Sequence, residues 1–169
     1  AKLEAGTDVS EVLDLILEGI YCRIGMDRAV FALLSPNRRF LRAKSARGSA
    51  TYYLMNKFKF EVDPQKPNIF HFVIESQSAL WVPDRNAGAI KKLIPESVHI
   101  VIGDSPFFIA PTLVDGKPIG IFYADRHDSG RELEHEEYES FKQFAIQADL
   151  ALAHLDKAQE KSNGSAQKS

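Results

Sequence analysis

Apolar residues recur at three- and four-residue steps near both ends of the chain, and this spacing predicts two amphipathic helices. The first is predicted over 8–24, where Asp8 and Glu11 have the spacing of a capping box and Gly25 is a natural stop. The second is predicted over 133–158. Glutamates crowd its first turns, where they suit the positive end of the helix dipole.

A first β-hairpin is predicted over 29–47, where an apolar run and an alternating run flank a Ser-Pro-Asn turn. Its second strand, from Phe40, should be exposed on one side, and the hairpin is strongly basic, with five cations: Arg38, Arg39, Arg42, Lys44 and Arg47. We interpret these charges as protection of an edge strand against pairing with another sheet. A site for an anionic partner is the alternative, although no aromatic stacking platform alternates with the charges.

A second hairpin is predicted over 107–125, because Asp115-Gly116 separates two apolar runs. Pro111 interrupts the first run, so we expect it at a sheet edge or a bulge. Both runs are apolar at consecutive positions, which indicates a sheet covered on both faces. The terminal helices should cover one face. The middle segment, 69–93, in which Asn68 caps a short helix, should cover the other.

The chain has 169 residues, which is room for a single domain, expected over 1–158. The remaining segment, 159–169, is rich in Ser, Gln and Lys and is predicted to be a disordered tail. No stretch reaches the roughly 18–20 uncharged apolar residues of a membrane helix. The net charge of −2 provides no general attraction for nucleic acid. We therefore expect a cytoplasmic protein without a membrane or nucleic-acid partner.

Four stretches, in this order along the chain, carry a family resemblance. The segment 8–48 forms an opening helix and hairpin, and "SALWVPD" over 78–84 forms a short strand. "LVDGKPIGIFYADR" over 113–126 forms a Gly-containing last hairpin, and "FKQFAIQADLALAHL" over 141–155 forms an alanine-rich closing helix. Up to about residue 156 the chain thus resembles a GAF domain. It is also similar to GAF-type regions that follow HDOD domains in bacterial signalling proteins.

The resemblance implies an α/β (α+β) fold with a mainly antiparallel sheet of about five or six strands. The long N- and C-terminal helices would lie on one face, with a cover of loops and short helices and a pocket on the other. It implies a non-catalytic regulatory or sensory domain of bacterial signal transduction that binds a small molecule in this pocket. The alternative is a protein-protein interaction or dimerisation module whose pocket is filled. Its partners would be a ligand, other domains of a longer signalling chain and a second copy.

The known chemistries of GAF domains do not match these residues. Asp125-Arg126 stands where cyclic-nucleotide-binding members resemble one another by an Asn-Lys pair, and Leu133 stands near their Phe. "NKFKFEVD" over 56–63 looks like part of that motif but lies in another segment. The single cysteine, Cys22, is on the first helix, where it is expected to be a small buried hydrophobe. It suits neither bilin attachment nor two-cysteine sulfoxide reduction. We expect no enzymatic activity and no cofactor.

Histidines do not have the spacing of a helical metal site, so no metal is expected. His71 is of interest because it lies in the segment predicted to line the pocket. The candidate ligand-binding residues are Phe72, Trp81, Asp84, His99, Asp104, Ser105, Phe107 and Tyr123. Trp81 and Tyr123 stand first because their rings combine apolar area with a polar group. The candidate interface residues are Val12, Ile16, Ile20, Tyr138, Phe141, Ala145, Ala148 and Leu152, and packing of these stripes on the sheet is the alternative.

Overall fold

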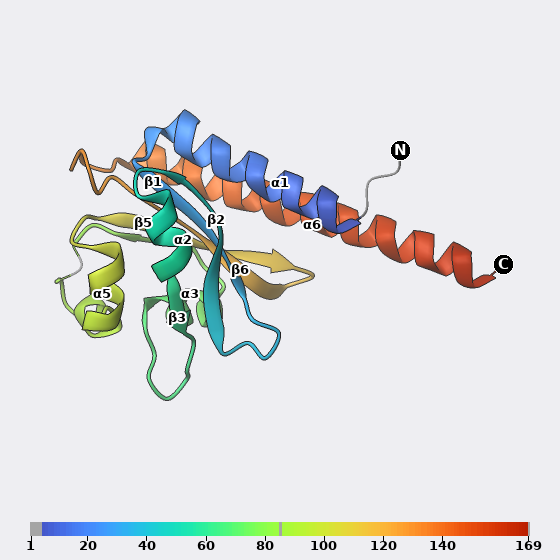
Figure 1. Cartoon of the computed structure of the whole chain (residues 1–169), viewed down its shortest axis with the longest axis horizontal. Helices are drawn as coiled ribbons and strands as arrows, with labels where there is room; N and C mark the ends of the chain where they lie inside the picture. Colours follow the sequence, from blue (N-terminus) through green and yellow to red (C-terminus); the bar gives the residue numbers. More distant parts are fainter. Residues whose placement is uncertain (1–4, 85, 169) are drawn as a thin grey trace.

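A six-stranded antiparallel sheet forms the middle layer of the molecule (Figure 1). In spatial order the strands are β3-β2-β1-β6-β5-β4. Their bounds are β1 (Arg28–Leu34), β2 (Phe40–Gly48), β3 (Lys59–Glu61), β4 (Leu80–Val82), β5 (Phe107–Val114) and β6 (Lys117–Asp125). The computed structural model describes residues 5–84 and 86–168. The predicted α+β fold with five or six mainly antiparallel strands is confirmed.

The terminal helices lie side by side on one face of the sheet, as predicted (Figure 1). Helix α1 (Ala5–Gly19) continues into a π-helical segment η1 (Ile20–Gly25), which ends at Gly25 as predicted. The predicted cap at Asp8 is wrong, because α1 already begins at Ala5. A cap contributes only about 1 kcal/mol, so packing can extend a helix past it.

Helix α6 (His135–Lys168) is longer than the sequence predicts. Its last turns cover 159–168, where the sequence predicts a disordered tail, and Figure 1 shows that they project past the sheet. The prediction rested on polar composition. Alanine and lysine are nevertheless good helix formers, and no proline interrupts the segment.

Four short helices cover the opposite face of the sheet. They are α2 (Thr51–Lys57), α3 (Ile69–Ser76), α4 (Ile90–Leu93) and α5 (Glu96–Ile102). Asn68 caps α3 as predicted, since its side-chain oxygen accepts a hydrogen bond from the backbone of His71 at 3.0 Å. The amide of Asn68 also donates to the carbonyl oxygen of Glu61 at 2.8 Å. One side chain therefore starts α3 and occupies an outward carbonyl group of the edge strand β3.

Each face of the sheet has its own hydrophobic core, as the continuous apolar runs predict. Along β5, Phe107 and Ile109 face the cover helices, and Phe108 faces α1 and α6. Burying a large apolar side chain contributes roughly 1.5–3 kcal/mol, so both covers are held mainly by this packing.

The β5–β6 hairpin accounts for the Asp115-Gly116 turn and for Pro111 within a strand. Asp115 and Gly116 both have positive φ, 52° and 74°, which is the backbone of a tight two-residue turn. Pro111 pairs with Ile121 of β6 but lies beyond the three residues of β5 that pair with β4. It therefore occupies an open edge, the first of the two predicted positions.

The structure corrects the interpretation of the basic second strand as an edge strand. Strand β2 is not an edge strand, because β3 pairs with its residues Phe40 to Arg42. Its burial alternates, so one side is exposed as predicted. The basic residues of β2 therefore do not all guard an open edge, because β3 occupies part of it.

Replacing Asn68 with alanine is expected to lower the free energy of unfolding by about 1–2 kcal/mol. The change removes the cap of α3 and the hydrogen bond to Glu61. Urea unfolding would measure it. Asn56→Ala is the matched control, because Asn56 is exposed and bonds only within its own helix, to Tyr52. It should change stability by less than about 0.5 kcal/mol. Equal losses in the two variants would contradict this role of Asn68.

Candidate functional site

The space between the sheet and the cover helices, where the sequence predicts a pocket, is occupied by aromatic rings. Phe58, Phe70, Phe107 and Tyr123 are fully buried there. Ring centroids of Phe58 lie 5.5 Å from those of Phe70 and Tyr123, and Phe107 lies 5.2 Å from Tyr123. These distances are those of well-packed aromatic pairs. The predicted ligand residues Phe107 and Tyr123 are thus core residues in this structure.

The other predicted ligand residues do not come together. Trp81 lies on the opposite face of the sheet, where its ring packs 5.7 Å from Phe108 and 5.8 Å from Tyr138. Adjacent strand residues point to opposite faces, and Val82, not Trp81, faces the cover. Phe72 is 45% exposed on the outer side of α3.

The polar candidates form turns and a small surface cluster. Asp84 is exposed and accepts a hydrogen bond from the backbone N–H of Asn86 at 2.9 Å, so its side chain caps a turn. His99 lies 2.6 Å from Asp104 and 3.5 Å from Glu96. The hydroxyl of Ser105 is buried and has no hydrogen-bond partner among the residues described.

A buried ion pair holds the cover to the sheet. The guanidinium of Arg28 donates to Asp125 at 2.6 Å and to the carbonyl oxygen of Ile102, the last residue of α5, also at 2.6 Å. Tyr123 donates to the same carboxylate at 2.5 Å, and the backbone of His127 donates at 3.1 Å. Burial and the charge of Asp125 raise the pKa of Tyr123 well above its ordinary value, so its hydroxyl stays a donor. Each charged or polar group in this cluster therefore has a hydrogen-bond partner, which offsets the cost of removing the two charges from water.

The next residue, Arg126, joins the two ends of the helical layer. Its guanidinium donates to the carbonyl oxygens of Ile24 at 3.2 Å and Gly25 at 3.0 Å, at the end of η1. It also donates to both carboxylate oxygens of Glu137, in the first turns of α6. This hydrogen bonding lowers the pKa of Glu137. Asp125 and Arg126 stand where cyclic-nucleotide-binding GAF domains have an Asn-Lys pair. Both form ion pairs within this chain, Asp125 with Arg28 and Arg126 with Glu137.

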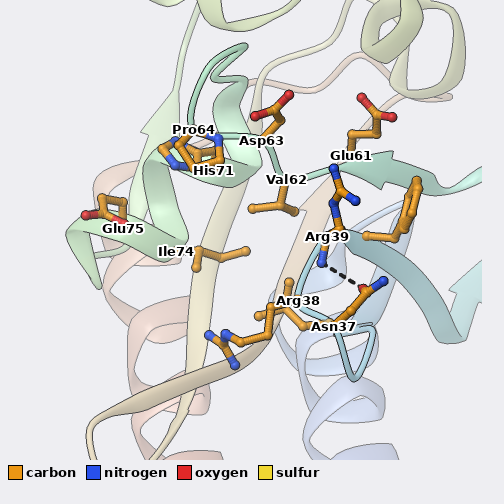
Figure 2. Close-up of a pocket in the computed structure, with 12 residues that line it drawn as sticks. Asn37, Arg38, Arg39, Glu61, Val62, Asp63, Pro64, His71, Ile74 and Glu75 are labelled. Carbon is orange, nitrogen blue, oxygen red and sulfur yellow. Dashed lines mark hydrogen bonds between the residues drawn. The ribbon is translucent and has the colours of Figure 1, made fainter.

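An open recess of about 540 Å³ lies at one end of the sheet (Figure 2). Its apolar part is formed by Leu34, Phe40, Val62, Pro64 and Ile74. Charged and polar side chains surround them, from the β1–β2 turn, from the end of β3 and the segment after it, and from α3: Asn37, Arg38, Arg39, Glu61, Asp63, His71 and Glu75. Figure 2 shows Arg39 extending toward Glu61. The sequence had pointed to His71 and the arginines, but not to the recess, which three separate segments assemble.

Two other expectations concern Cys22 and metals. Cys22 is exposed, not buried, and its thiol donates to Glu18 at 3.0 Å, which raises the thiol pKa. The buried positions of η1 are taken by Ile20 and Ile24 instead. Within 5–84 and 86–168, no group of three or more His, Cys, Asp or Glu side chains could hold a metal ion.

Within one chain, the predicted interface residues lie in or beside the core. Ile20, Phe141, Ala145, Ala148 and Leu152 are buried in the core of this chain, and Val12, Ile16 and Tyr138 are half-buried. Packing on the sheet, the stated alternative, explains them. The exposed apolar residues of the terminal helices are different ones: Leu15 of α1 at 73%, Ile146 of α6 at 47% and Leu150 of α6 at 66%. Helical spacing places Leu15 and Leu150 opposite the buried faces.

Comparison with known proteins identifies the fold. No family model matches the sequence, and no curated protein matches it. Residues 122 to 287 of a methyl-accepting chemotaxis protein superpose with a TM-score of 0.70 at 24% identity, covering 89% of this chain and 92% of that one. The GAF domain/HD domain protein of Geobacter sulfurreducens gives 0.69 at 15% identity, with 89% and 95% covered. The PixJ GAF domain of Thermosynechococcus elongatus, in its blue-light-absorbing form, gives 0.71 at 14% identity, with 97% and 96% covered.

The chain therefore has the fold of GAF domains, and the resemblance seen in the sequence is confirmed at the level of the fold. In the part of the chain that the structure describes, no helix is both long and apolar enough to cross a membrane.

Asp125→Asn is expected to lower the free energy of unfolding by about 3–5 kcal/mol, because it leaves the Arg28 cation buried without a counter-charge. Glu137→Gln is the comparison. Arg126 is also buried, but it keeps its hydrogen bonds to the carbonyl oxygens of Ile24, Gly25 and Glu132, and the side chain of Glu137 is 23% exposed to water. The change should therefore cost less than Asp125→Asn, about 1–2 kcal/mol. Chemical unfolding of both variants would measure the difference, and equal costs would contradict it.

The Glu137→Gln variant also carries a pH test. Because the folded-state pKa of Glu137 is lowered, its stabilisation is present above the ordinary value of 4.5 and is lost as the pH falls through the folded value. The stability gap between wild type and Glu137→Gln should therefore be full near about pH 6 and narrow toward about pH 3.

Proposed function

We propose that this chain is a non-catalytic sensory domain of a longer signalling protein. The fold supports this proposal, because the similar structures include a segment of a chemotaxis protein and a GAF domain of PixJ. The observation that carries it is the pair Asp125 and Arg126 at the end of β6. Asp125 is bonded through Arg28 to the last residue of α5, and Arg126 is bonded to η1 and α6. A shift of the cover layer can thus reach the terminal helices, which would connect to neighbouring domains.

The proposed ligand site is the recess of Figure 2. Aromatic rings fill the interior, so a small molecule would bind at this open end between the sheet and α3. Its apolar part would contact Leu34, Val62 and Ile74, and an anionic group would bind Arg39. Among the residues described, Arg39 forms no ion pair in the chain. Arg38 already donates to the carbonyl oxygen of Pro118 at 2.9 Å and is positioned by that bond.

Native mass spectrometry of freshly purified protein tests this site. We expect a non-covalent adduct that is released on denaturation. Val62→Trp should fill the recess and abolish the adduct, and Arg39→Ala should weaken it about tenfold by removing a charged hydrogen bond.

Ser97→Trp is the control, because Ser97 lines a separate recess beside α5. It should leave the adduct unchanged. A clean apo mass, or an adduct that survives Val62→Trp, would exclude the recess as the ligand site.

A second candidate function is dimerisation through the outer face of α1 and α6. Leu15, Ile146 and Leu150 are the observation that favours it, since they are large, apolar and exposed on this helix pair. Gly19 lies against the ring of Phe144, where a Cβ would come within 2.5 Å of a ring carbon, so the two helices approach closely. Because the two helices run in opposite directions (Figure 1), the contact of Gly19 with Phe144 places Leu15, one turn earlier, beside the segment that carries Ile146 and Leu150. A second copy could cover this face with its own.

Light scattering during size-exclusion chromatography tests dimerisation. Wild type is expected to elute as a dimer and the double variant Leu15→Glu/Leu150→Glu as a folded monomer, because two charges would be buried at the contact. Ile100→Glu is the control, since Ile100 is equally exposed but lies on α5. A monomeric wild type, or a dimeric double variant, would contradict this interface.

A further inference from the structure

Three cations form an exposed group on the neighbouring strands β2 and β3, which we name the basic ribbon: Arg42 and Lys44 of β2 and Lys59 of β3. Leu41 and Ala43 belong to the core under the cover helices. Successive strand residues point to opposite faces, so Arg42 and Lys44 project from the other face. Figure 1 shows that β3 and the adjoining part of β2 lie away from α1 and α6.

The basic ribbon is electrostatically unfavourable for the isolated chain. Arg42 and Lys59 are directly opposite each other in the register of β2 and β3. Like charges in that arrangement destabilise a sheet. None of the three cations forms an ion pair with another residue that the structure describes, and the ammonium of Lys59 lies 5.0 Å from the ring centre of Phe40. By contrast, the next cation along β2, Arg47, is paired with Glu18 at 2.9 Å and with Asp14 at 3.8 Å.

Edge protection accounts for Lys59, which lies on the edge strand β3, but not for Arg42. Strand β3 already pairs with β2 at Arg42, so that charge guards no open edge. The unpaired charges are more simply explained by a partner that neutralises them.

We propose that the basic ribbon binds an extended, acidic polypeptide segment of a partner protein. Arg42 and Lys44 are two residues apart on one face of a strand, about 6.6–6.8 Å along its axis. An extended segment with carboxylates at alternate positions has the same repeat, so it can pair with both cations at once. Lys59 on the neighbouring strand supplies a third contact.

The surroundings of the basic ribbon favour a short acidic segment over a long polyanion. Glu61 borders it on β3, and the half-exposed carboxylates of Asp14 and Glu18 lie beside Arg47, further along β2. A nucleic acid or an anionic membrane would extend over these acidic residues and be repelled, and the net charge of −2 adds to this.

Fluorescence anisotropy with a labelled peptide of alternating Glu and Thr tests the proposal. Wild type is expected to bind the peptide at low salt, and more weakly as salt increases. The triple variant Arg42→Gln/Lys44→Gln/Lys59→Gln should bind about tenfold more weakly, from three exposed charge pairs. A peptide of alternating Gln and Thr should not bind.

The control is Lys91→Gln/Lys117→Gln/Lys157→Gln, which removes the same charge from exposed positions on α4, β6 and α6. It should bind the acidic peptide as wild type does. Equal losses in the two triple variants would mean that only overall charge matters and would overturn the proposal. So would no binding by wild type, or tighter binding of duplex DNA or phosphatidylserine vesicles through the same three residues. Circular dichroism and thermal unfolding verify that each variant is folded.

Discussion

The buried pairing of Asp125 with Arg28 is the constraint on which the rest of the structure depends. A carboxylate and a guanidinium removed from water must satisfy each other completely, and here a tyrosine hydroxyl, a backbone amide and the last carbonyl group of α5 complete the set. That requirement fixes where α5 ends relative to β1 and β6. Arg126, one residue later, imposes a matching requirement on the other face, where η1 ends and α6 begins. The end of β6 therefore locates both covers of the sheet.

Aromatic packing between the sheet and the cover leaves the proposed binding sites on the surface. Phe58, Phe70 and Tyr123 fill the layer in which a ligand would be enclosed, and this packing stabilises the fold at the expense of an internal site. Three surfaces remain: the recess beside α3, the outer face of the terminal helices, and the basic ribbon. The recess and the basic ribbon are neighbours, because Phe40 and Glu61 line the recess and adjoin Lys59, whereas the outer face of the terminal helices lies apart from both. A second copy on that face would therefore not exclude a ligand or an acidic segment.

Local signals in the sequence predicted the elements well. Asp115-Gly116 needs only its own backbone preference to make a turn, and Asn68 needs only the amide of His71 to begin a helix. Continuous apolar runs such as 107–114 predicted burial on both faces, because the residues of a strand alternate between faces whatever covers them. The errors concern contacts made at a distance. Trp81 was expected on the face of the sheet under the cover helices, but its neighbour Val82 lies there and Trp81 lies on the opposite face. Cys22 is exposed because the π-helical segment buries Ile20 and Ile24 instead.

By itself, the sequence determined the order of helices and strands, the two hairpins and the presence of two cores, because propensity and periodicity act over a few neighbouring residues. Only the tertiary structure decided what those elements assemble. The recess draws on three segments between residues 34 and 75, Asp125 meets an arginine 97 residues away, and β3 turns β2 from an edge strand into an inner one. Such juxtapositions depend on strand register and layer packing, which join distant parts of the chain and leave no local pattern.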